Sequence, residues 1–170
     1  MNDKYIGASV FRYTYRPLGH SKCDGGFTVT VFENCMLSFC DYDRHGFPMH
    51  ECWFDISKDV LLALHRLIDD NKTILMQRMP LMIAKSDPLF GCVFGFDQYR
   101  PIYIIGLYDL AKQARENTPG LLAQRVVMIF DSVSNLLLSC GLYLSIENFV
   151  WFQHATMINE TYFYPHSVDK

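Results

Sequence analysis

The sequence of 170 residues carries little charge, and what charge it has is not clustered. Charged residues make up 19% of the chain, below the ~25% typical of soluble domains, and the formal net charge is −3. No run of lysines and arginines could neutralise a row of phosphates, which is the main source of non-specific affinity for nucleic acids. Nucleic-acid binding is therefore disfavoured.

Targeting signals and long apolar runs are also missing. The first twenty residues lack the basic segment and apolar stretch of a signal peptide. No run reaches the ~18 to 20 apolar residues that a membrane-spanning helix needs, and the nearest, 132–146, contains Ser and Asn. We therefore expect a soluble, cytoplasmic protein without a membrane segment. Its six cysteines should be mainly thiols in that compartment.

The motifs of common enzyme classes are absent from the sequence. It has no G-x-S-x-G, no H-E-x-x-H, no phosphate-binding P-loop and no Rossmann fingerprint. Half of the residues are hydrophobic and 15% are aromatic, a balance opposite to that of disordered chains. This apolar excess indicates either a thick core or an apolar surface that meets a partner. No catalytic residue and no cofactor-binding motif is predicted.

The order of periodic segments predicts one α+β domain over residues 1–170. Alternating or β-branched segments predict strands near 11–16, 27–32, 35–43 and 49–56. Further on, LFGCVFGF and PIYIIGLY predict a β-hairpin, and LYLSI and NFVWF predict two more strands. Because strands and helices do not alternate strictly, a mainly antiparallel sheet is expected, with two principal helices at about 58–70 and 119–140.

Both helices have recognisable starts. Ser57 is a suitable N-cap for the first helix, and Asp59 in its first turn suits the helix dipole. Thr118 and Pro119 predict the start of the second helix. The second helix is apolar around most of its circumference, with one mostly polar stripe. Such a helix is either buried on several sides or shared with a second subunit, so a homodimer through 119–140 is one expectation.

One segment, CMLSFCDYDRHGFPMHEC at 35–52, gathers residues with chemical potential. If Glu33 and Asn34 form a two-residue turn and 44–48 form the next loop, Cys40 lies opposite Cys52 on neighbouring strands. Cys40, His50 and Cys52 would then share the apolar face of the sheet, whereas Cys35 would point away from Cys40.

Three interpretations of this cluster remain open. Buried cysteines behave as small hydrophobes, so the thiols could simply fill the core. The cluster could also bind zinc through Cys40, His50 and Cys52, with Cys23, His20 or His45 as the fourth ligand, although the C-x₂-C knuckle of structural zinc sites is missing. A reactive cysteine is the third interpretation, weakened by a separation of about 7 Å between residues two apart on a strand.

The sequence therefore favours a function in binding over a function in catalysis. We expect a protein-binding module, of the kind found among bacterial or phage accessory proteins, that acts as an inhibitor or adaptor or by self-association. The alternative is a metal-dependent or cysteine-dependent enzyme that uses the cluster of Cys40, His50 and Cys52.

Overall fold

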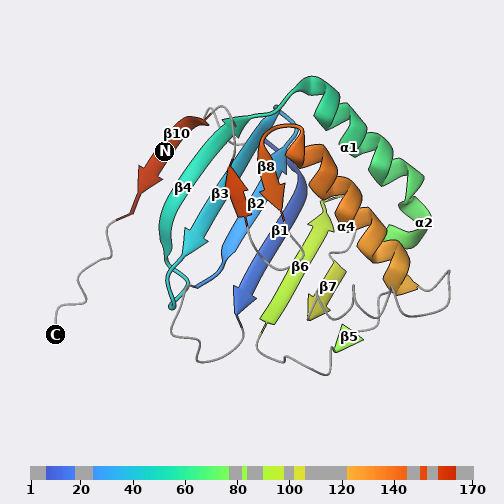
Figure 1. Ribbon diagram of the computed structural model, residues 1–170, viewed down its shortest axis with the longest axis horizontal. Coiled ribbons are helices and arrows are strands. Elements are labelled where there is room, and N and C mark those ends of the chain that lie inside the picture. Colours follow the sequence, from blue (N-terminus) through green and yellow to red (C-terminus); the bar gives the residue numbers. More distant parts are fainter. Residues whose placement is uncertain are drawn as a thin grey trace.

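An eight-stranded sheet dominates the computed structural model, and helices cover one of its faces (Figure 1). The strand order is β10-β4-β3-β2-β1-β6-β7-β5, and every neighbouring pair is antiparallel except β5 with β7. The predicted α+β class with a mainly antiparallel sheet is confirmed. The structure describes residues 7–17, 25–76, 82–83, 90–97, 102–105, 122–144, 150–152 and 157–163.

The sheet strands are β1 (Ser9–Pro17), β2 (Phe27–Phe32), β3 (Met36–Tyr42), β4 (Pro48–Asp55), β5 (Met82–Ile83), β6 (Phe90–Phe96), β7 (Ile102–Ile105) and β10 (Met157–Tyr162). The helices are α1 (Lys58–Asp70), the short α2 (Lys72–Leu75) and α4 (Leu122–Leu138). Strands β8 (Leu142–Leu144) and β9 (Val150–Phe152) pair with each other in a separate hairpin.

Helix α1 starts and ends as the sequence predicts. The Ser57 hydroxyl accepts a hydrogen bond from the backbone N–H of Val60 at 3.3 Å, so Ser57 is the N-cap. The helix contacts α4 and buries one apolar face, formed by Val60, Leu61, Leu64 and Ile68. A hydrophobic face at this spacing is what holds a surface helix in place.

Helix α4 crosses the same face of the sheet and buries one side, not several, through Val126, Val127, Ile129, Phe130, Val133 and Leu137. Phe130 packs on Tyr13 of the central strand β1, with ring centroids 5.5 Å apart. The predicted polar stripe faces solvent, because Met128, Asp131 and Asn135 are exposed. The predicted start of this helix at Thr118 and Pro119 lies outside the described residues, and a homodimer through the helix stays a prediction.

The turn between β2 and β3 differs from the expected one by a single residue. Three residues form it instead of two, and the third, Cys35, has a positive φ of 61°. A three-residue hairpin loop commonly ends with a residue in this left-handed conformation. The added residue shifts the β2–β3 register by one position. An irregularity between Asp41 and Tyr42 shifts the β3–β4 register as well, so Cys40 lies opposite Glu51 and not opposite Cys52.

This shift exchanges the two faces of β3 while leaving β2 and β4 as predicted. The predicted core positions of β2 and β4, such as Val29, Val31 and Phe54, are buried. On β3, however, Leu37 and Phe39 join the core face, and Cys40 points to the other face. The predicted register of β3 was therefore wrong, because a slip of one residue sends every side chain of a strand to the opposite face.

The second half of the chain follows the prediction where the structure describes it. Strands β6 and β7 form the predicted antiparallel hairpin, and β5 lies at the sheet edge beside β7. Strand β10 was not predicted, although it forms the other edge of the sheet. None of the helices in the described part of the chain has the length and apolar character needed to cross a membrane.

Candidate functional site

A cluster of three side chains lies where β10 joins the sheet, on the face that also carries the helices. His50 and Cys52 come from β4, and Glu160 comes from β10. Glu160 is paired with Cys52 in the β10–β4 register, and Tyr162 is paired with His50. Directly paired residues of antiparallel strands share a face, so the ladder itself brings these side chains together.

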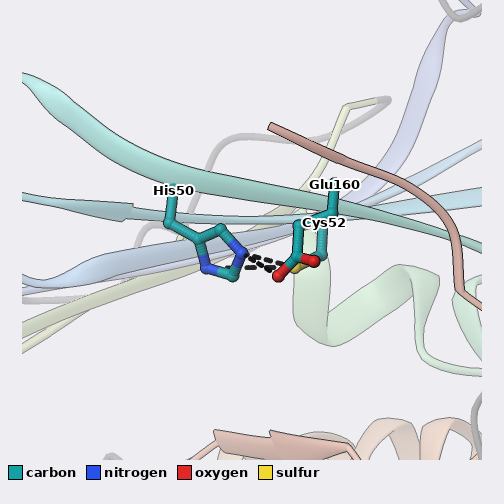
Figure 2. A group of neighbouring side chains, drawn as sticks. All are labelled: His50, Cys52 and Glu160. Carbon is teal, nitrogen blue, oxygen red and sulfur yellow. Dashed lines mark hydrogen bonds and ion pairs between the residues drawn. The ribbon is translucent and has the colours of Figure 1, made fainter. Parts of the chain in front are cut away.

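The polar atoms of the three side chains converge on one point (Figure 2). The His50 Nε2 atom lies 2.6 Å from Glu160 Oε1 and 3.2 Å from Cys52 Sγ. One ligand atom from each residue lies within 4.8 Å of the other two. Cys52 is 1% exposed at the base of the cluster, and the His50 and Glu160 side chains are 21% and 37% exposed.

The structure brings together two of the three predicted metal ligands. Cys40 does not join His50 and Cys52, because the shifted register places it on the opposite face, where its thiol approaches the Asp41 carbonyl oxygen at 3.6 Å. Glu160 takes the place that was predicted for Cys40. The expected separation of about 7 Å between His50 and Cys52 does not apply to their polar atoms. His50 Nε2 and Cys52 Sγ lie 3.2 Å apart, because the side chains lean along the strand toward each other.

The three predicted candidates for a fourth ligand lie elsewhere. Cys23 and His20 are outside the described residues. His45 is exposed in the β3–β4 turn, where its Nε2 atom accepts a hydrogen bond from Arg44 Nε at 3.0 Å. Besides Glu160, Asp41 on β3 is a carboxylate on the same face of the sheet as the cluster, because it is paired with His50.

Burial and negative charge hold the Cys52 thiol protonated. Burial is the larger cause that raises its pKa to about 11, and the charges of Glu160, Asp41 and Glu51 add to it. Hydrogen bonds from Tyr162 and then His50 lower the pKa of Glu160, so this carboxylate is ionised at neutral pH. The cluster is thus a buried thiol beneath a partly exposed imidazole and carboxylate.

Tyr162, which lies next to the cluster, fixes the orientation of the Glu160 and His50 side chains. Its hydroxyl donates a hydrogen bond to Glu160 Oε1 at 2.8 Å. Its ring stacks on the His50 ring, with centroids 4.4 Å apart and an angle of 19° between the planes. Partners that orient ligands in this way are typical of metal and catalytic sites.

The arrangement does not match a cysteine nucleophile with its general base. A nucleophile, histidine and carboxylate in catalysis normally use the two different ring nitrogens, so that the carboxylate orients the base. Here both Cys52 Sγ and Glu160 Oε1 are closest to the same atom, His50 Nε2. The raised pKa of Cys52 also disfavours the thiolate that such a mechanism needs.

Glu160 was missed because nothing near it in the sequence marks it. It is separated from His50 by 110 residues, and its strand carries mostly exposed side chains without a clear alternation. Only the pairing of β10 with β4 reveals it. Comparisons of the chain with protein-family models, curated proteins and solved structures find no match.

Proposed function

We propose that the protein acts by binding another protein, and that it does so through the β10 edge of its sheet. The observation that carries this proposal is where the exposed apolar side chains gather. Ten large hydrophobic residues are exposed in the described part of the chain, and five of them lie on β10 or next to its end. These five are Met49, Met157, Ile158, Tyr162 and Phe163.

The backbone of β10 can also bind a partner, through hydrogen-bonding groups on its outer side. β10 is the last strand in the described sheet order, so in these residues no strand pairs with its outer side. The Phe163 N–H bonds to the Met49 carbonyl oxygen at 2.8 Å, which places the alternate N–H groups, those of Tyr162 and Glu160, toward the outside. An extended peptide can add itself to such an edge through main-chain hydrogen bonds.

Two features make this edge selective for its partner. A bulge between Met157 and Asn159 interrupts the regular ladder, and Glu160 places a charge on the strand. Both features are known to limit indiscriminate pairing of edge strands. The nearby carboxylates of Asp41 and Glu51 add negative charge, so the partner segment we expect is extended, with apolar side chains and at least one lysine or arginine.

The experiment compares two substitutions at one position. Tyr162→Pro removes the outward N–H without touching the ladder to β4, and Tyr162→Ala removes the same ring but keeps the N–H. Partners are captured from host lysate with each protein, and the same proteins are examined by sedimentation velocity. We expect capture to be lost with Tyr162→Pro, and to be weakened but still present with Tyr162→Ala, which removes one ring of the apolar surface and keeps the N–H. A monomeric wild-type protein whose capture is unchanged by Tyr162→Pro would refute the proposal.

Self-association through the same edge is the second outcome that this design recognises. It would appear as a dimer of the purified wild-type protein that Tyr162→Pro dissociates and Tyr162→Ala does not. An inhibitor or adaptor function corresponds instead to a monomer that captures a different chain. The matched pair therefore separates a heterologous partner from a second copy.

A further inference from the structure

The cluster of His50, Cys52 and Glu160 offers one sulfur, one nitrogen and one oxygen ligand within a small volume. The distances between these atoms, 3.2 Å from Nε2 to Sγ and 2.6 Å from Nε2 to Oε1, are those of hydrogen bonds. Ligands of a tetrahedral zinc ion lie about 2.0–2.3 Å from the metal, and therefore about 3.3–3.6 Å from one another. Movements of less than about 1 Å would open these two distances to the spacing of a zinc site.

The kinds of atom select the metal. Magnesium and calcium prefer ligands that are all oxygen, whereas zinc binds thiolate, imidazole and carboxylate. The mixed set of Cys52, His50 and Glu160 therefore fits zinc. Three protein ligands leave one position for water, and Asp41 lies on the same face, in register with His50, as an alternative occupant.

The surroundings favour a cation over an empty hydrogen-bonded cluster. Glu160 belongs to the cluster, and Asp41 is paired with His50 on the neighbouring strand, so two carboxylates lie on this face of the sheet. A divalent ion would offset these charges and displace the thiol proton. Because the His50 and Glu160 side chains are partly exposed, the ion can enter from solvent.

The groups around the ligands resemble the outer shell of a metal site. Tyr162 donates to Glu160 and stacks on His50, which holds both ligands in place before an ion arrives. In known metal sites, partners of this kind orient the ligands, and their removal lowers metal affinity. This support comes from the same strand as Glu160, so ligand and partner move together.

We infer that His50, Cys52 and Glu160 bind one zinc ion, which ties the edge strand β10 to β4. Two ligands belong to β4 and one to β10, so the ion bridges the outermost pair of strands. This inference does not depend on the proposed partner, since the site is formed within one chain. If partner capture fails and zinc still binds, only the proposed function is lost.

The test uses the full-length protein, freed of metal by a chelator and titrated with Co²⁺ alone, which gives a thiolate charge-transfer band in sites with cysteine. We expect the band to saturate at one equivalent and to disappear when Zn²⁺ is added. Cys52→Ser should abolish the band, and Glu160→Gln should weaken Zn²⁺ binding at least tenfold. Cys40→Ser is the matched control, because it removes a thiol from the opposite face of the neighbouring strand, and it should bind like the wild type.

Two results would overturn the inference. One is a folded wild-type protein that shows no saturable band. The other is a Cys40→Ser variant that loses binding as fully as Cys52→Ser. Far-UV circular dichroism checks that each variant is folded. If Cys52→Ser does not fold, Glu160→Gln decides alone, because Glu160 is exposed on an edge strand and its amide variant keeps the same shape.

Discussion

Replacing Phe130 by alanine tests how α4 is seated on the sheet. Phe130 is 1% exposed and its ring packs on that of Tyr13 at 5.5 Å, in the middle of the core. Truncating a buried phenylalanine costs about 3–5 kcal/mol, because apolar burial is lost and a cavity remains. Domains are stable by only about 5–15 kcal/mol, so we expect Phe130→Ala to remove a large share of the stability.

Urea unfolding followed by circular dichroism measures this loss. With a slope of about 2 kcal/mol/M, the midpoint should fall by about 2 M. The melting temperature should fall by about 6–20 °C for a chain of this size.

Met128→Ala is the control on the same helix, because Met128 is 66% exposed. A surface change of this kind should alter the unfolding free energy by no more than about 0.5 kcal/mol. A cost below about 1 kcal/mol for Phe130→Ala would refute the packing of α4 on β1. A cost for Met128→Ala that grows with protein concentration would instead show that α4 forms a subunit interface, as the sequence had suggested.

Three further predictions concern local features. Ser57→Ala removes the cap of α1 and should lower the unfolding free energy by about 1 kcal/mol, whereas Ser57→Asp should restore it; equal losses in urea unfolding would contradict the capping role. The N–H groups of Phe47 and His45 lower the pKa of Asp43, so the stability this adds should be present at pH 7 and fade as the pH falls below about 4. Asp43→Asn should remove the decrease in unfolding free energy below about pH 4, and an unchanged dependence on pH would contradict the role of Asp43. In metal-free protein, Cys52 should react with iodoacetamide at neutral pH at least 100 times more slowly than an unperturbed thiol, since its pKa is about 11; rapid labelling, followed by mass spectrometry, would revive the reactive cysteine.

Local signals in the sequence were enough to predict α1. Its N-cap, its acidic first turn and its apolar spacing all lie within the helix or next to it, and the structure confirms each of them. The strands β2 and β4 were likewise predicted with the correct faces, because their alternation is clear. These features depend only on residues close together in the chain, so a single sequence is enough to predict them.

The register of β3 could not be predicted in the same way. It depends on the irregularity between Asp41 and Tyr42 at the end of β3, and on the turn before β3, which holds three residues and ends with Cys35 in the left-handed conformation. Glycine or asparagine at that position would have indicated the longer turn, but cysteine has no such preference. Two local irregularities, one at each end of β3, thus separate Cys40 from the candidate site.

Glu160 shows the other limit of a single sequence. Its place in the site follows from pairing between strands far apart in the chain, and the polar segment that carries it gives no sign of its partner. The predicted grouping was therefore correct for His50 and Cys52, which share one strand, and wrong for Cys40, which depends on the register of a hairpin. It did not include Glu160, whose strand pairs with β4 from far along the chain.

The position of β10 beside β4 also determines the order in which the sheet can be completed during synthesis. His50 and Glu160 are 110 residues apart, and ribosomes add about 5–20 residues per second. For about 5–20 s after β4 emerges, it is therefore an open edge, with the Cys52 thiol lacking the strand that later lies beside it. A nascent chain in this interval presents a different edge to its surroundings from that of the finished protein, and chaperones that recognise exposed strands would meet β4 first.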